Sequence, residues 1–184
     1  MNRILSLLKE LIVVTLGILI ALGVNRWSEQ QKDERFIQAA LTTIAQEIAE
    51  SKVELDSTIQ QQEKIRDQLF ESLENEDSTY IVEITAGAGG LPQPELKDIG
   101  INYLTTHRAE LLDYELITYL SNIQFNIEQI DRSFDKLADN AYSLIYRNDE
   151  EAKYELAIRI GDLINGGQNL LTLYEEDKVR PFLE

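Results

Sequence analysis

The chain has 184 residues and a net charge of −16, with 33 acidic against 17 basic side chains. A chain this acidic repels phosphate groups and anionic surfaces, which argues against nucleic acid as a partner. It contains no cysteine, so disulfides and thiolate chemistry are excluded, and with 43% hydrophobic residues it can bury a core.

The run from Leu11 to Val24 (LIVVTLGILIALGV) carries no charge and lies near the start of the chain. By itself it is shorter than a bilayer core of about 30 Å, but the apolar residues before it extend the helix from Ile4 to Trp27, which is long enough to span. Trp27 is placed to anchor the helix at the membrane interface, where an amphipathic ring is favoured. We therefore expect residues 1–27 to form a single transmembrane helix.

A cleaved signal peptide is the alternative for the same residues. Arg3 and Lys9 would form its positive n-region, and Ala21-Leu22-Gly23 would be its cleavage site. Because Glu10 directly precedes the apolar run, we expect the segment to be retained.

One face of the predicted anchor helix carries small and polar residues. At 100° per residue, Glu10, Val14, Gly17, Ala21 and Asn25 fall in one stripe. Small residues four apart let another helix approach closely in lipid, and polar side chains on the same face can bond across the contact. These five residues are the predicted partner-binding face. The stripe could equally be a coincidence, because small residues are common in spanning helices.

The run ELIVVTLGILIALGVNRWSE, from Glu10 to Glu29, resembles the start of an uncharacterised family of bacterial membrane proteins found in Bacteroidota and their relatives. The matching positions are Glu10, Gly17, Ala21, Leu22, Asn25, Trp27 and Glu29. Residues 103–137 resemble the family's helical region more loosely, and Gly23 departs from its pattern. The resemblance implies a membrane anchor with a helical domain, and it brings no known activity.

Charge around the anchor does not decide its orientation. Arg3, Lys9 and Arg26 against Glu10 give the first 26 residues +2, which leaves −18 for the rest of a chain whose total is −16. Positive side chains flank the apolar run on both sides. Because short N-terminal tails usually stay in the cytoplasm, we expect an inner-membrane (cytoplasmic-membrane) protein with a periplasmic domain.

Residues 28–75 contain no glycine or proline and predict one long juxtamembrane helix. Its apolar stripe is interrupted by Ser51 and Gln62. Residues 76–94 are predicted as an extended segment followed by a Gly/Pro loop, since Thr79–Thr85 is β-branched and alternating. The glycines lack the strand–loop–helix context of a phosphate-binding loop, so a plain connection is expected.

Residues 95–184 predict a helical bundle domain. A short helix over Glu95–His107 is expected to bend at Gly100, and a helix over Glu110–Arg147 carries apolar residues at alternating spacings of four and three. This seam comprises Leu116, Leu120, Ile123, Ile127, Ile130, Phe134, Leu137, Ala141 and Leu144. A further seam, interrupted at Asn165-Gly166-Gly167, runs through Leu156, Ile160, Leu163, Leu170 and Tyr174. The expected fold is all-α: one transmembrane helix, an antiparallel helical bundle with long helices, and one short extended, glycine-rich segment.

Catalytic, cofactor-binding and metal-binding residues are not predicted. His107, the single histidine, lies three residues before Glu110, but one such pair is too few ligands for a metal site in a bundle. The acidic clusters fall at predicted helix ends, where they are usually solvated, and they lack the order of a calcium loop.

We therefore predict a non-enzymatic accessory or scaffolding subunit, without cofactors. Its partners would be membrane lipid and, through the anchor, other membrane subunits or a second copy. The alternative is a sensor or ligand-binding module, disfavoured because the sequence before the anchor is too short to form an output domain.

Overall fold

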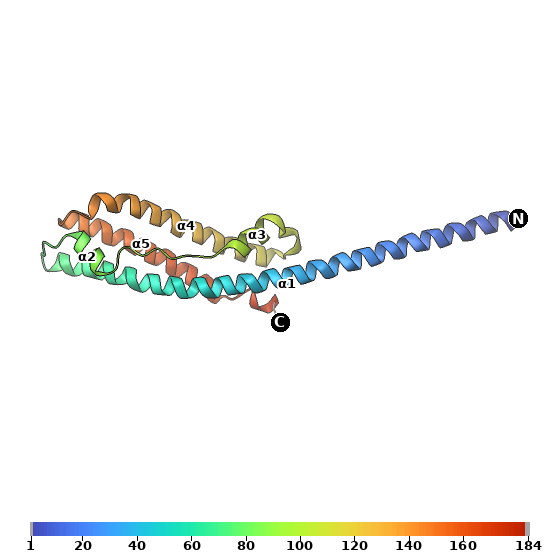
Figure 1. Cartoon of the computed structure of the whole chain (residues 1–184), viewed down its shortest axis with the longest axis horizontal. Coiled ribbons are helices and arrows are strands. Elements are labelled where there is room, and N and C mark those ends of the chain that lie inside the picture. Colours follow the sequence, from blue (N-terminus) through green and yellow to red (C-terminus); the bar gives the residue numbers. More distant parts are fainter. Residues whose placement is uncertain (1, 183–184) are drawn as a thin grey trace. The chain divides into compact units, whose positions relative to one another are not determined.

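The structure, a computed structural model, describes residues 2–182, with side chains from residue 10 onward. Within residues 2–182 the chain forms five α-helices and two short 3₁₀ turns, and no strand. It divides into two compact units, Met1–Ala40 and Leu41–Glu184. The predictions of an all-helical protein and of a long helix with an apolar N-terminal part are confirmed (Figure 1).

Helix α1 (Asn2–Glu74) contributes to both units and ends at a defined stop signal. Glu76 adopts the left-handed conformation, with φ of 48°, that terminates many helices. The Asp77 N–H then donates to the Ser72 carbonyl at 3.0 Å, which satisfies one of the last free carbonyls of α1.

Helix α2 (Ile81–Gly87) corrects the prediction of an extended segment over Thr79–Thr85. Its first two N–H groups donate to carbonyls of the residues that directly follow the fourth helix, Ile81 to Arg147 at 3.1 Å and Val82 to Ile145 at 2.7 Å. Helical geometry buries Ile81 and Thr85, four residues apart, and the Thr85 hydroxyl donates to the Ile81 carbonyl at 3.0 Å. These tertiary contacts outweigh the β-propensity of the segment.

The connection from α2 to helix α3 (Ile99–His107) has no regular structure over residues 91–98. Gly89 and Gly90 open it with φ of 93° and 99°, values that favour glycine. The predicted helix over Glu95–His107 is therefore too long at its start: Gly100 lies in the first turn of α3 and does not bend a longer helix. A 3₁₀ turn, η1 (Ala109–Leu111), follows.

Helix α4 (Tyr114–Leu144) carries the predicted seam. Its N-terminus is capped by Asp113, whose carboxylate accepts the Leu116 N–H at 2.8 Å. Every seam residue is buried except Phe134, which is half-buried. The periodicity of this helix is therefore confirmed with one exception.

Helix α5 (Glu150–Glu175) is continuous, so the predicted interruption at Asn165-Gly166-Gly167 is wrong. An alanine Cβ at position 167 would lie 2.9 Å from Ile59 Cδ1 of α1, whereas one at 166 would make an ordinary contact with Ile130 at 3.6 Å. Gly167 thus serves close packing between helices rather than a break. The chain closes with the 3₁₀ turn η2 (Arg180–Phe182).

The core of the second unit is built around α5. Figure 1 shows α5 beside both α4 and the cyan part of α1. The nearness of Ile59 to Gly167 and of Ile130 to Gly166, where an added Cβ would lie 2.9 and 3.6 Å away, agrees with this placement. Near one end, the Tyr119 hydroxyl of α4 donates to the Leu173 carbonyl of α5 at 3.0 Å.

Candidate functional site

The apolar run of α1 is exposed along its whole length. Its ten large aliphatic residues between positions 11 and 24 are each 53–70% exposed. An 18-residue window of this helix has a mean hydropathy of 1.8 with none of it buried, and no other helix among the described residues passes the same test for a membrane span. This helix is therefore long and apolar enough to cross a membrane.

Polar groups within the apolar run find partners inside the helix. The Thr15 hydroxyl donates to the Leu11 carbonyl one turn back, at 2.8 Å. Such a bond removes the cost of an unpaired hydroxyl in lipid, where no water can replace it. The one polar side chain in the middle of the run is therefore compatible with a hydrocarbon environment.

The predicted partner-binding face lies along α1 as an open strip. Glu10, Val14, Gly17, Ala21 and Asn25 are all exposed, and a Cβ at Gly17 would meet no atom within 4 Å. Close approach of another helix is sterically possible there. The assignment of this face stays a prediction.

At the C-terminal end of the strip, the polar side chain of Asn25 is partly used within its own helix. The Asn25 amide donates to Glu29 Oε1 at 3.0 Å along the same helix, so one of its N–H groups is already engaged. Trp27, the predicted interface anchor, is 65% exposed two residues further on. An amide partly satisfied within its own helix has less to offer a partner than a free one.

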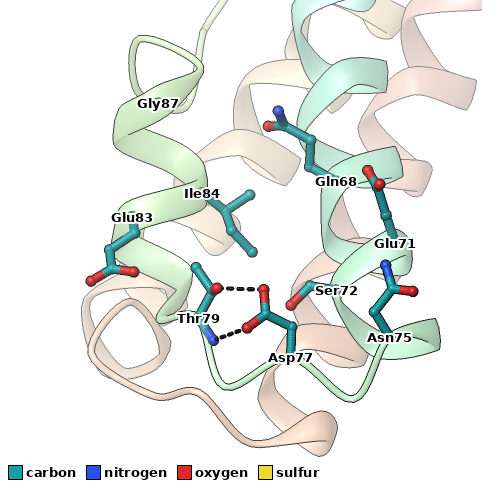
Figure 2. A pocket seen from close by; sticks show the side chains of 9 residues that line it. All are labelled: Gln68, Glu71, Ser72, Asn75, Asp77, Thr79, Glu83, Ile84 and Gly87. Atoms are coloured by element: carbon teal, nitrogen blue, oxygen red, sulfur yellow. Dashed lines mark hydrogen bonds between the residues drawn. The ribbon is translucent and has the colours of Figure 1, made fainter.

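A polar cavity of about 290 Å³ forms a second candidate region, in the Leu41–Glu184 unit (Figure 2). It lies where the end of α1, the connection that follows and α2 come together. Its lining residues are Gln68, Glu71, Ser72, Asn75, Asp77, Thr79, Glu83, Ile84 and Gly87.

Three carboxylates line this cavity, those of Glu71, Asp77 and Glu83, and that of Asp77 is bound by a neighbouring residue. Asp77 accepts the Thr79 N–H at 3.1 Å and the Thr79 hydroxyl at 2.5 Å, as the dashed lines in Figure 2 show. These two bonds, the hydroxyl first, lower the pKa of Asp77, and the charge of Lys153 lowers it further. Asp77 is thereby held ionised as a turn-forming group, and it is poorly placed to act as a general base.

Lys153 is a buried cation next to the cavity that sequence reasoning missed. Its side chain is 1% exposed, and its ammonium donates to Ser72 Oγ at 2.8 Å and to the Asp77 carbonyl. Both acceptors belong to the end of α1 and the residues that follow it. The ammonium therefore ties the start of α5 to the end of α1, and its donors are used for structure.

Buried polar residues on α1 were also missed by sequence reasoning. Ser51 accepts the Lys97 N–H at 2.9 Å, the Gln62 amide donates to the Pro92 carbonyl at 3.2 Å, and Glu47 accepts the Gly100 N–H with both oxygens, at 3.1 and 3.0 Å. They fix the irregular segment before α3 against α1. The signal that could have found them is their register, because Ser51 and Gln62 occupy positions where the apolar stripe continues.

Burial also affects the ionisation of Glu47. Desolvation raises the pKa of this carboxyl above its usual 4.5, with Asp98 and Glu50 adding to the effect, while the Gly100 N–H and Lys97 oppose it. Raised carboxyl pKa values occur at functional sites but also in structural networks. Here both oxygens are bonded to the backbone of α3, which makes a structural role the direct reading.

The remaining titratable residues singled out in the sequence do not come together. His107, at the end of α3, is exposed and lies against the Tyr103 ring, with centroids 5.3 Å apart. Glu110 pairs with Arg108 at 3.2 Å. Among the residues whose side chains are described, no group of three or more His, Cys, Asp and Glu side chains is arranged to hold a metal ion.

Similarity to other proteins gives no guide to this chain. The resemblance of residues 10–29 to a bacterial membrane family stays a prediction, and any functional conclusion depends on the residues described above. Comparison with protein-family models, with curated proteins and with solved structures finds no match.

Proposed function

We propose that this chain is a non-enzymatic single-pass membrane protein that serves as an accessory or scaffolding subunit of a membrane complex or of a homo-oligomer. In this proposal residues 1–27 anchor the chain in the inner membrane, and the Leu41–Glu184 unit is an antiparallel helical bundle on the periplasmic side. The observation that carries the proposal is the uniformly exposed aliphatic surface between positions 11 and 24.

Energetics support membrane insertion of that surface. The ten exposed aliphatic residues would each contribute about 0.3–0.6 kcal/mol on insertion, which gives roughly 3–6 kcal/mol in total. Glu10 and Asn25 lie at the two ends of the run, where head groups and water can solvate them. In water the same surface would have to be covered by another protein.

A scaffolding role is favoured over a ligand-sensing role by how the polar groups of the second unit are used. Ser51, Gln62 and Lys153 all bond to other parts of the same chain. A ligand site inside the bundle would need polar groups left available to orient the ligand. Apart from the polar cavity of Figure 2, the accessible features are surfaces, and surfaces suit association with other subunits.

Retention of the anchor is tested by the intact mass of the membrane-extracted protein. We expect the mass of the full chain, because Glu10 next to the apolar run is unfavourable for a signal peptide. A mature chain beginning near Val24 would make the segment a signal peptide and overturn the anchor.

Partner binding is tested by co-purification of the chain with its membrane complex at equal expression. Gly17→Leu and Ala21→Leu fill the strip while keeping the helix apolar, so association should fall; Leu19→Ala, on the opposite face, is the matched control. Asn25→Leu should weaken association by only about 0.6–2 kcal/mol. Equal behaviour of the leucine variants and the control would reduce the anchor to a tether.

A further inference from the structure

An apolar groove of about 240 Å³ runs along the last three turns of α4, in the Leu41–Glu184 unit. Its lining residues are Phe134, Ala138, Ala141 and Tyr142 of α4, Ile145 directly after α4, Thr85 of α2 and Leu91. It is separate from the polar cavity of Figure 2 and shares no lining residue with it.

The groove exists because the seam of α4 is incompletely covered at this point. Phe134 follows the spacing of the buried seam but is only half-buried, and Tyr142 two turns later is 80% exposed. A half-covered phenylalanine and an exposed tyrosine on one helix face leave apolar area that a further side chain could cover. Aromatic residues with such access are typical of the centre of a protein–protein contact.

Acidic residues of α4 lie beside the groove. Asp131, Asp135 and Asp139 are exposed and recur every four residues, so they form a row along α4 next to the row of Phe134, Ala138 and Tyr142. The nearest cation before them, Arg132, is bound by Glu128 one turn back at 2.6 Å. Lys136 lies two residues from Phe134 and therefore on the opposite side of the helix.

We propose that this groove is the docking site for a basic amphipathic helical segment of a partner protein. The apolar residues of that segment would lie on Phe134 and Tyr142, and its lysines or arginines would face the aspartate row. This inference deepens the accessory-subunit proposal and depends on it for the existence of a partner. It concerns a surface distinct from the strip on the anchor.

Charge favours a basic segment over a second copy of the chain or a lipid surface as the occupant of the groove. A second copy of the chain would bring another net charge of −16 to the aspartate row beside the groove, and an anionic lipid surface would be repelled in the same way. A basic segment gains both burial of its apolar face and attraction to the row. Helix-in-groove binding of this kind is a recurrent mode of peptide recognition.

The test uses the full chain in nanodiscs of uncharged phosphatidylcholine and a fluorescently labelled helical peptide with leucine on one face and lysine on the others. Fluorescence anisotropy should report binding, and a peptide with glutamate in place of lysine should not bind. Ala138→Arg should weaken binding by about tenfold or more, because the arginine fills the groove and its positive charge repels the lysines of the peptide. Ala49→Arg, an equal change at an exposed position on α1, should leave binding nearly unchanged.

The aspartate row is tested by Asp135→Asn with Asp139→Asn, which should also weaken binding by about tenfold. Its matched control is Glu54→Gln with Asp56→Asn, the same loss of charge at exposed positions on α1. Equal effects of both pairs would mean that net charge alone holds the peptide, and the groove assignment would be wrong.

Two further outcomes separate this proposal from the anchor. Displacement of the peptide by unlabelled full chain would make a second copy the occupant and overturn the inference. Gly17→Leu should bind the peptide like the unaltered chain, because that residue lies on the anchor. If the unaltered chain fails to bind the peptide but still co-purifies with its membrane complex, the groove proposal is refuted and the accessory-subunit proposal is not.

Discussion

The glycines of α5 provide a quantitative test of how closely this helix approaches α1. Gly161 and Gly167 both lie inside the helix, so replacing either by alanine should gain about 0.5–1 kcal/mol in helix propensity. A Cβ at 161 would meet nothing within 4 Å. Gly161→Ala should therefore stabilise the protein by that amount.

At Gly167 the same change meets side chains of α1. The new Cβ would lie 2.9 and 3.1 Å from Cδ1 and Cγ1 of Ile59 and 3.2 Å from Leu55 Cδ1, against about 3.5–4.0 Å for a normal contact. Overpacking of this kind costs about 1–3 kcal/mol. Because the propensity gain is common to both variants, the two free energies of unfolding should differ by that overpacking cost.

The assay is thermal unfolding of the full chain in detergent, followed by circular dichroism. For a chain of this size about 1 kcal/mol shifts Tm by about 2–4 °C. The Tm of Gly161→Ala should therefore be higher than that of the unaltered chain, and the Tm of Gly167→Ala should be measurably lower than that of Gly161→Ala. Gly166→Ala, which gains only an ordinary contact at 3.6 Å, should behave like Gly161→Ala. Ile59→Val removes the Cδ1 atom and should relieve Gly167→Ala. If Gly167→Ala is stabilised as much as Gly161→Ala, then α5 does not approach α1 this closely.

Two buried charged residues give further predictions. Lys153→Met should lower the free energy of unfolding by about 1.5–3 kcal/mol, because it leaves the Ser72 hydroxyl and the Asp77 carbonyl without their charged donor. Lys64→Met, the same change at an exposed position, should have little effect. Equal Tm values of the two variants would contradict the role of Lys153. The raised pKa of Glu47 means that the folded state binds its proton more tightly than the unfolded state, so this contribution to stability is present below the usual pKa of 4.5 and is lost as pH rises above it. Glu47→Gln, which keeps an acceptor for Gly100, should therefore raise Tm at about pH 7 and not at about pH 4, and a gain of equal size at both pH values would contradict it.

Periodic sequence signals predicted the long helices well. The alternating four and three spacing over Leu116 to Leu144 identified the buried face of α4, because a helix that buries one side leaves a strong and local pattern. Phe134 is the exception, since its burial depends on which elements reach that part of the helix. A pattern on one helix carries no information about how completely its neighbours cover it.

Predictions failed where distant contacts decide the local structure. The segment Thr79–Thr85 alternates like a strand, yet it is helical because its first N–H groups find carbonyls of Ile145 and Arg147, more than sixty positions away in the chain. Gly167 resembles a helix breaker, yet it is required for contact with α1. In both cases the residue types allow two structures, and only the tertiary partner selects one.

The candidate sites likewise divide into those that a local sequence pattern could predict and those that depend on distant contacts. The apolar run on α1 is recognisable from composition, because every residue in it points to the same conclusion. Ser51 and Gln62 seemed to interrupt an apolar stripe, and Lys153 gave no signal at all, since a polar residue in a core position is explained only by its partner. The groove on α4 could not be predicted, because Leu91 and Thr85 join it from other elements.

The way the polar side chains are used bears directly on function. A catalytic site needs a nucleophile or base whose bonding capacity is left for a substrate. In the second unit Asp77 is bound by Thr79, Glu47 by Gly100 and Lys153 by Ser72, so these groups hold irregular segments and helix ends in place. Apart from the polar cavity of Figure 2, two uncovered surfaces are apolar: the run from Leu11 to Val24 and the groove beside the aspartate row. Burial of such surfaces is the driving force of insertion and association, which is why we propose that this protein works by binding other components of a membrane rather than by transforming a substrate.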